Sequence, residues 1–400
     1  MKYHIDCDGN CYNCLSSPCE NRDRGLGDTS LTEAEKKFLN MSSPYIKYQH
    51  KKLAEKIEKL LKDGDNISEK ELKEIVKYGI SRERWLEVRH LPIEERISEY
   101  RKIWEKSKNK INTSNKDMKK EERIAVYANT VAIVNKGKYM SPKGNEVTID
   151  STKMVEGTKF YGKKAIVDYD SLPKYPTEIM VVDNDCLYEA KHLIDNGFNP
   201  CVLNMASFHK PGGGVVEGSS AQEENIFRRT NLFLSLYQFH SIGENYGIKQ
   251  REERYPLDYN FGAIYTPHVT VFKGSEDVDY APLDETFEIG VVSVSAIKKP
   301  TLNVKGQLAP WVVDATKSKI RQMLDVALEN GHDSMVLSAF GCGAYKTPPT
   351  EMARLFKEVL STDKYKNAFK VIHFAIINLA STNGMHNPQG NFKPFYDAFA

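Results

Sequence analysis

The sequence predicts an α/β protein in which a buried, mostly parallel or mixed sheet is flanked by helices. From about residue 121 onward, short continuous apolar runs alternate with helical stretches, a pattern typical of strands that are buried on both faces. Before that point, residues 31–110 have helical periodicity, and four of the seven cysteines lie within the first twenty residues. We therefore expect a short Cys-rich segment at 1–30, a helical N-terminal extension at 31–115 and an α/β domain at 116–400.

The elements of the α/β domain follow from its apolar runs and from the stretches between them. A first helix is expected to end near Gly137, where glycine provides a stop. The expected strands are 147–149, 178–182, 201–206, 263–265, 269–272, 289–296, 334–340 and 371–378. Further helices are expected at 185–196, 223–238, 315–330 and 350–360.

Composition places the chain among ordinary globular proteins. Hydrophobic residues make up 40% and charged residues 28%, and the net charge of +2 gives no overall attraction to nucleic acid. No stretch has the length of a membrane span, and the N-terminus lacks the apolar core of a signal peptide. We expect a cytoplasmic protein with no membrane partner, in which the cysteines are mostly reduced.

The N-terminal cysteines form a compact group with the spacing C-x3-C-x2-C-x4-C: Cys7, Cys11, Cys14 and Cys19. Four soft ligands this close together could bind a structural zinc or hold an iron–sulfur cluster. The alternative is a tail whose thiols are incidental. The first three cysteines also have radical-SAM spacing, which we discount because nothing downstream predicts a matching barrel.

A glycine-rich loop with two carboxylates after it is the main candidate for a functional site. It follows the apolar run 200–203, and a helix is expected to begin where the loop ends. The candidate residues are Asn204, Gly212, Gly213, Gly214, Gln222, Glu223 and Glu224. Glycines let backbone amides approach an anionic ligand, and the helix N-terminus adds a positive partial charge. A carboxylate beside a bound phosphorylated sugar is what glycosidic bond cleavage requires.

A second loop has the same strand–loop–helix context. It follows the run that begins at Ser334 and contains the candidate ligand-binding residues Gly341, Gly343, Ala344 and Tyr345. This arrangement also suits an anion at a helix N-terminus, although an ordinary strand-to-helix turn would have the same pattern.

The first loop resembles the signature of the poly(ADP-ribose) glycohydrolases, in particular the bacterial-type branch. Pro-Gly-Gly-Gly, seven residues and then Gln-Glu-Glu recur there in this order, followed by an arginine and a leucine that match Arg228 and Leu232. The second loop is similar to the diphosphate-binding loop of the macrodomain fold, to which that family belongs. Tyr265–Phe272 resembles another family stretch. The resemblance covers about residues 98–400 and implies a macrodomain-type catalytic domain at 116–400.

The resemblance also implies roles for individual residues. Glu224 matches the catalytic general acid and base, and Glu223 is expected to hold ribose hydroxyls while Gln222 orients the loop. Asn204 is a candidate ribose contact, with a polar strand cap as the alternative. The two glycine loops would hold the diphosphate and terminal ribose of ADP-ribose. The implied substrates are poly(ADP-ribose) or ADP-ribosylated macromolecules, and catalysis needs no cofactor.

Two rival functions remain at this level. A non-catalytic ADP-ribose reader has no need of the acid, so the intact Gln-Glu-Glu argues against it. An enzyme that removes single ADP-ribose units is not separated by sequence. Ser219 and Phe227 depart from the family pattern and put the shape of the pocket in question. Phe392 or Phe395 could form an adenine wall, although aromatic residues there are more often core.

Overall fold

The computed structural model describes residues 118, 120–378 and 385–400 of the chain. The chain divides into two units, with the boundary between Asp117 and Met118. The described residues all belong to the second unit. The expected Cys-rich segment at 1–30, its four candidate metal ligands and the helical extension at 31–115 lie outside the described residues.

The second unit is built on a seven-stranded sheet with the order β3-β6-β7-β5-β8-β9-β4. Five neighbouring strands, from β7 to β4, are parallel, whereas β3 and β6 pair antiparallel at the other side. The prediction of a mixed sheet is therefore confirmed. The strands are β3 (Lys159–Tyr161), β4 (Glu178–Val182), β5 (Pro200–Met205), β6 (Ala263–Lys273), β7 (Pro282–Val294), β8 (Ser334–Leu337) and β9 (Val371–Ala375). A separate two-stranded sheet joins β1 (Lys138–Met140) to β2 (Glu146–Thr148).

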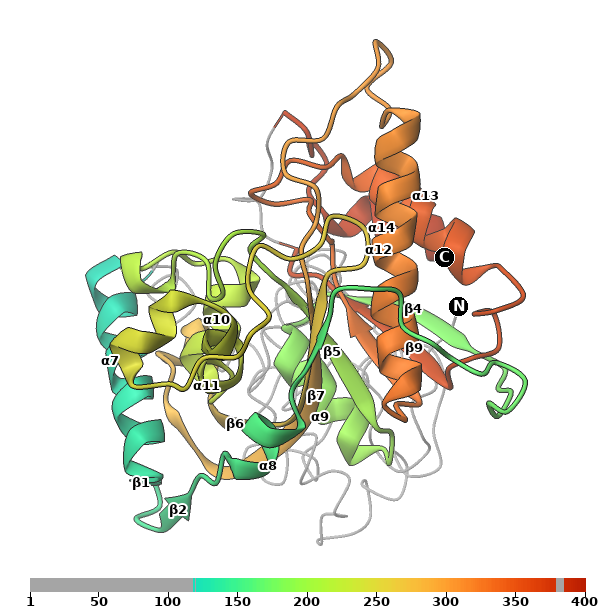
Figure 1. The fold of residues 1–400 in the computed structure, drawn as a ribbon. Helices are drawn as coiled ribbons and strands as arrows, with labels where there is room; N and C mark the ends of the chain where they lie inside the picture. Colours follow the sequence, from blue (N-terminus) through green and yellow to red (C-terminus); the bar gives the residue numbers. More distant parts are fainter. Residues whose placement is uncertain (1–117, 119, 379–384) are drawn as a thin grey trace, which may run out of the picture. The chain divides into compact units, whose positions relative to one another are not determined.

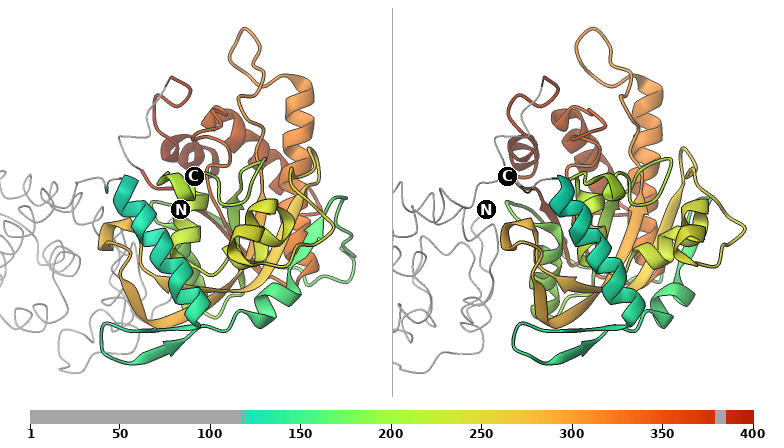
Figure 2. Two further views of the ribbon diagram at one scale, coloured as in Figure 1. Left: turned by 60° about the vertical axis from the view of Figure 1, so that its left-hand side comes forward. Right: turned by 90° about the vertical axis from the view of Figure 1, so that its left-hand side faces the viewer.

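Helices cover the sheet from both sides (Figures 1 and 2). They are α7 (Lys120–Lys136), α8 (Thr152–Gly157), α9 (Cys186–Asp195), α10 (Gln222–Arg229), α11 (Phe233–Leu236), α12 (Pro310–Glu329), α13 (Pro349–Leu360) and α14 (Phe392–Phe399). Alternate side chains of β5 enter two different cores. Cys201 and Leu203 pack with residues of α12 and α13, while Val202 packs with residues of α9, α10 and α11. This is why the strand reads as a continuous apolar run.

Two of the expected elements differ in the structure because of contacts across the sheet. The segments 263–265 and 269–272 belong to one strand, β6, which carries a register shift between Thr266 and Val269. Pro267 has no N–H to donate, and His268 has a φ of 51°, so the strand bulges without ending. The helix expected at 223–238 stops at Arg229, because Thr230 is extended and bridges to Val271 of β6.

Other boundaries move by a few residues. α12 begins at Pro310, five residues before the expected start, with proline in a position that suits the first turn of a helix. β8 and β9 each end three residues before expected, at Leu337 and Ala375. The chain therefore leaves the sheet early at these strand ends, which lie at the same edge as the end of β5. The sequence did not predict β1, β3, α8 or α14.

In the part of the chain that the structure describes, no helix combines the length and the apolar character needed to cross a membrane.

Candidate active site

The two glycine loops leave the carboxyl ends of adjacent parallel strands. β5 pairs directly with β8, and the loop 206–221 follows the first strand while the loop 338–348 follows the second. We call these segments the first loop and the second loop. They touch, because the main-chain N–H of Phe208 donates a 2.9 Å hydrogen bond to the Tyr345 hydroxyl. Ligands of open α/β sheets bind at this edge.

The first loop folds around the two carboxylates that follow it. Glu223 accepts hydrogen bonds from the main-chain N–H groups of Ser207 (2.8 Å) and Gly212 (2.9 Å), one on each oxygen. Glu224 accepts a hydrogen bond from the Gly214 N–H at 2.9 Å. Both glutamates are buried. The two glutamates at the start of α10 therefore hold the loop through its main-chain N–H groups. The same hydrogen bonds fix the direction of both carboxyl groups.

Glycine is required at the centre of this loop. Gly213 has a φ of 51°, and a Cβ there would lie 2.5 Å from Oε1 of Glu224 and 3.2 Å from Oε2 of Glu223. Gly212 has a φ of 77°, and its Cβ would lie 2.7 Å from the ring of Phe227. These positions combine a left-handed backbone with a close approach, which only glycine meets without strain.

Gln222 fixes the base of the loop by pairing with the main chain of β5. Its side-chain oxygen accepts from the Met205 N–H at 2.7 Å, and its Nε2 donates to the Leu203 carbonyl at 2.6 Å. The amide thus takes the place of a strand partner at the end of β5, and this geometry suits the loop-orienting role that the resemblance implies.

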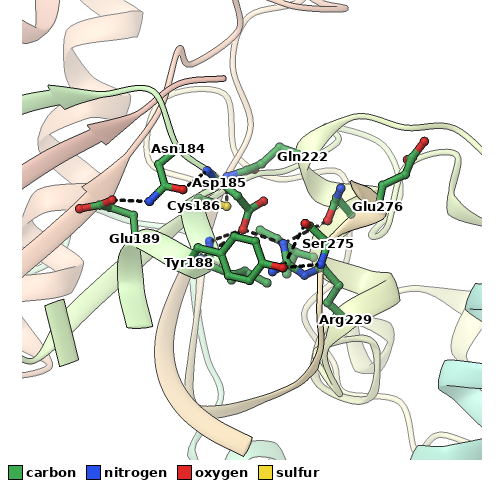
Figure 3. A network of polar contacts seen from close by, with 12 residues as sticks. Asn184, Asp185, Cys186, Tyr188, Glu189, Gln222, Arg229, Ser275 and Glu276 are labelled. Atoms are coloured by element: carbon green, nitrogen blue, oxygen red, sulfur yellow. Dashed lines mark hydrogen bonds and ion pairs between the residues drawn. The ribbon is translucent and has the colours of Figure 1, made fainter. Parts of the chain in front are cut away.

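The far end of α10 is held by a buried ion pair, which Figure 3 shows in its network. Arg229 lies 2.7 Å from Asp185, and both side chains are almost wholly buried. Asp185 also caps α9 by accepting from the N–H groups of Leu187 and Tyr188. Arg229 in turn lies 4.9 Å from the Tyr188 ring centroid. Because breaking one partner of a buried pair costs about 3–5 kcal/mol, this network anchors the helix that carries both glutamates.

The environment of Glu223 favours its protonated form. Burial raises the pKa of Glu223 to about 8, and the charge of Glu224 adds to this, while the amides of Gly212 and Ser207 act in the opposite direction. Both oxygens already accept main-chain hydrogen bonds, so this residue positions the loop. The ribose contact expected for Glu223 stays a prediction.

Glu224 differs from Glu223 because only one of its two carboxylate oxygens has a hydrogen-bond partner among the described residues. Its Oε1 is held by Gly214, whereas its Oε2 is buried and has no hydrogen-bond partner among the described residues. A buried carboxylate oxygen without a partner is costly unless a ligand or water meets it. This oxygen is therefore the group of the site that is best placed to exchange a proton with a bound substrate.

Asn204 lies deeper than the sequence suggested. It is fully buried at the end of β5, opposite Ser293 of β7, and its Nδ2 donates to the Ser293 hydroxyl at 3.0 Å. Its Oδ1 has no partner among the described residues. The amide also lowers the pKa of Glu223. Asn204 thus interacts with the Glu223 carboxyl group from within the core. Its expected contact with a ribose stays a prediction.

The second loop is more open than the first. Gly341 has a φ of 75°, and its Cβ would lie 2.7 Å from the Cβ of Ala296, so the fold itself requires this glycine. A Cβ at Gly343 would meet nothing within 4 Å. Gly343 and Ala344 are exposed, and Tyr345 is half-buried against the first loop. The structure thus brings the four predicted residues of this loop to the same edge as Glu223 and Glu224.

Sequence reasoning missed two contributors. Ser207 supplies an amide to Glu223, and Tyr255 has a buried hydroxyl without a partner among the described residues. Burial raises the pKa of Tyr255, and Glu223 and Tyr345 raise it further. Tyr255 lies in an irregular segment far from both loops in sequence, and no motif marked it.

Of the aromatic residues considered for the shape of the pocket or for an adenine wall, Phe227 and Phe395 lie in the core. Phe227 is fully buried beneath Gly212, so its departure from the family pattern changes the support of the loop and not the wall of a pocket. Phe395 packs against Phe356 and Phe374 and is also fully buried, which rules it out as an adenine wall. Phe392 is half-buried and stacks on Tyr396.

The site contains no cluster of metal ligands within the described ranges, since no group of three or more His, Cys, Asp or Glu residues is arranged to hold an ion there. The predicted cysteine site is not addressed by this observation, because it lies outside those ranges.

Comparison with known proteins gives a match to one family. Residues 128–274 match the family model described as microbial-type PARG, catalytic domain. This segment is therefore similar to the catalytic domain of the microbial-type poly(ADP-ribose) glycohydrolases. The matched segment includes β5, the first loop and α10. No curated protein matches the chain.

Solved structures of poly(ADP-ribose) glycohydrolase from Thermomonospora curvata are similar to this chain. One has 26% sequence identity and a TM-score of 0.58, covering 70% of this chain and 100% of that chain. Another, bound to the inhibitor ADP-HPD, has 27% identity and a TM-score of 0.56, covering 70% of this chain and 98% of that chain. The similarity therefore extends over essentially the whole length of the bacterial enzyme.

Proposed function

We propose that this site hydrolyses the ribose–ribose glycosidic bonds of poly(ADP-ribose) and releases ADP-ribose, with Glu224 as general acid and base. The observation that carries the proposal is the arrangement of Glu224. One of its oxygens is fixed by the Gly214 amide at 2.9 Å, and the other is buried without a partner among the described residues. Such a carboxyl group is oriented, shielded from water and still able to transfer a proton.

The reaction follows from this arrangement. The carboxyl group of Glu224 gives its proton to the departing ribose oxygen while the bond from that oxygen to the anomeric carbon breaks through an oxocarbenium-like state. The same carboxylate then accepts a proton from the water that adds to the anomeric carbon. The net result is addition of one water across one glycosidic bond, giving ADP-ribose and a chain shortened by one unit.

The glycine loops would bind the rest of ADP-ribose. The exposed backbone at Gly343 and Ala344 can approach a diphosphate closely, because no side chain intervenes. Tyr345 holds the second loop against the first through Phe208. A diphosphate placed there would stabilise positive charge developing on the ribose.

The decisive experiment is incubation of the full chain with poly(ADP-ribose) and, separately, with a protein carrying single ADP-ribose units, followed by chromatography of the products. We expect ADP-ribose from the polymer, released at least about 10²-fold more slowly when Glu224→Gln replaces the wild type. Release only from the singly modified protein would replace the proposal with a mono-ADP-ribosyl hydrolase. Binding of ADP-ribose without release from either substrate would replace it with a reader.

We further propose that Cys7, Cys11, Cys14 and Cys19 hold a structural zinc or an iron–sulfur cluster, on the basis of their spacing. The purified full chain should carry about one zinc ion or one cluster, which the double change Cys11→Ser and Cys14→Ser removes. Elemental analysis of protein prepared without chelator that finds neither zinc nor iron would overturn this. The cytoplasmic location expected from the sequence stays a prediction.

A further inference from the structure

The segment that joins β7 to α12 is a well-formed hairpin and not a plain connection. We call residues 297–309 the rim hairpin. Leu302 bridges to Leu308, and the Ala309 N–H donates to the Thr301 carbonyl at 3.0 Å. At the tip, the Asn303 side chain accepts from the N–H groups of Lys305 (2.9 Å) and Gln307 (3.0 Å). These contacts give the tip a defined shape, and Figures 1 and 2 show the segment projecting beyond the first turn of α12.

The rim hairpin is attached to the proposed active site. The main-chain N–H of Lys299 donates to the carbonyl of Tyr345 in the second loop at 2.7 Å. On its other arm, the Leu308 N–H donates to Glu351 of α13 at 3.1 Å. The hairpin is therefore joined directly to the second loop. Its side chains would lie close to a ligand that binds at Gly343 and Tyr345.

The surface of this region is basic. Lys298, Lys299 and Lys305 of the rim hairpin are exposed, as is Lys346 beside Tyr345. None of the four has an ion pair with a described residue. Across residues 297–316 the sequence offers a single acidic side chain, Asp314. Unpaired lysines in a row along one border create a positive potential that favours a polyanion.

Exposed apolar and aromatic side chains belong to the same hairpin and to the first turn of α12 that follows it. Trp311 is 54% exposed and Leu302 is 41% exposed, while Val304 at the tip is completely exposed. Trp311 is the one tryptophan of residues 118–400. An exposed indole beside lysines is the combination on which unpaired bases stack while phosphates meet positive charge.

We propose that the rim hairpin and Trp311 bind the poly(ADP-ribose) chain beyond the unit held in the active site. Lysine side chains would contact its phosphates, and the indole would stack on an adenine. This rests on the proposed function, since it names where the polymer continues after leaving Glu224. The observations favour a polymer over a protein surface, because four lysines that have no ion pair with a described residue border one loop that already contacts the site.

The test uses the full chain carrying Glu224→Gln, so that polymer is bound and not consumed. Affinities for free ADP-ribose and for size-fractionated poly(ADP-ribose) are measured by fluorescence anisotropy at several salt concentrations. The rim variant combines Lys298→Gln, Lys299→Gln and Lys305→Gln. The matched control combines Lys136→Gln, Lys143→Gln and Lys153→Gln, three exposed lysines on the segments around α7, β1, β2 and α8, which lie at the opposite end of the domain in Figure 1.

We expect the rim variant to bind long chains at least about tenfold more weakly, with a log–log salt slope smaller by about two, since each phosphate contact contributes about 0.7. Trp311→Ala should weaken long-chain binding at least about fivefold. Affinity for free ADP-ribose should not change in either variant, and the control should bind both ligands like the parent.

Other results would overturn the inference. These are unchanged long-chain affinity in the rim variant, an equal loss in the control, or an equal loss of affinity for free ADP-ribose. A rim variant that loses binding only to an ADP-ribosylated protein, and not to free polymer, would assign the surface to protein contacts instead. Failure of the proposed function is separate: it would appear as wild-type protein that binds chains through the rim but releases no ADP-ribose.

Discussion

The two glycine loops leave adjacent strands and meet at the same edge of the sheet, yet Gly213 of the first loop and Gly343 of the second differ in what surrounds them. A Cβ at Gly213 would lie 2.5 Å from Glu224 and 3.2 Å from Glu223, so the glycine lets the loop close on α10. In the second loop, a side chain at Gly343 would meet nothing within 4 Å. The space beside Gly213 is thus filled by the protein's own carboxylates, whereas the space beside Gly343 is open to a ligand. A glycine motif alone does not separate these cases.

The largest effect should come from Glu224, whose Oε2 has no hydrogen-bond partner among the described residues. Glu224→Gln retains the size and the acceptor for Gly214 but has no proton to give to the leaving oxygen. We expect turnover of poly(ADP-ribose) to fall by about 10²–10⁴-fold, with ADP-ribose affinity little changed because the loss belongs to the transition state. Product release is followed by chromatography. Near-normal turnover would remove Glu224 from the role of acid.

A matched pair of glycine changes tests the comparison itself. Gly213→Val should lower the melting temperature and weaken ADP-ribose binding more than tenfold, since it strains a left-handed backbone and displaces both carboxylates. Gly343→Val should leave the melting temperature unchanged, because the added side chain meets no protein atom. It should still weaken ADP-ribose binding, because the side chain would occupy space that the ligand needs. Calorimetry and thermal melting measure both. A destabilised Gly343→Val would mean that the two loops do not differ as described.

The next effect concerns Glu223, whose pKa is raised to about 8 in the folded protein. Between the ordinary pKa of glutamate and about 8, the folded state holds a proton that the unfolded state does not. The stabilisation is therefore complete at low pH and is lost as the pH rises through 8. Wild-type stability should fall over this window, and Glu223→Gln should reduce that slope, as measured by thermal melting from pH 5 to 9.

The same substitution should affect function more broadly than Glu224→Gln. An amide at position 223 can accept from only one of the Ser207 and Gly212 amides, so the first loop loses one anchor. We expect roughly tenfold losses in both binding and turnover. Glu217→Gln, on an exposed residue of the same loop, serves as the control. If Glu223→Gln and Glu217→Gln behave alike in pH dependence and activity, the positioning role fails.

The smallest effect should come from the contact between the loops. Tyr345→Phe removes the hydroxyl that accepts from the Phe208 N–H. We expect the free energy of unfolding to fall by about 1 kcal/mol and ADP-ribose affinity to fall a few-fold, as measured by denaturant titration and calorimetry. Tyr396→Phe, on an exposed ring, is the control. An unchanged affinity in Tyr345→Phe would show that the loops bind ligand independently.

The sequence by itself determined the fold class and the residues of both loops. Continuous apolar strands predicted the buried sheet, because alternate side chains such as Val202 and Leu203 must enter two different cores. The order of glycines and carboxylates marked the first loop, because close main-chain approach permits few other residues at Gly213. A loop of this kind can be predicted from sequence because its residues are close together in the chain. The family resemblance added the roles expected of the individual residues.

Only the tertiary structure decided how those residues divide their tasks. Glu223 and Glu224 are adjacent and chemically identical. The two oxygens of Glu223 accept from the amides of Ser207 and Gly212, while Oε2 of Glu224 has no partner in the part of the chain that the structure describes. Tyr255 and the break after Arg229 were equally hidden, since both depend on segments far away in the chain, the second through the bridge from Thr230 to Val271. Burial and the number of hydrogen-bond partners depend on which distant segments pack around a residue. The sequence gives the chemical groups but not their positions in space.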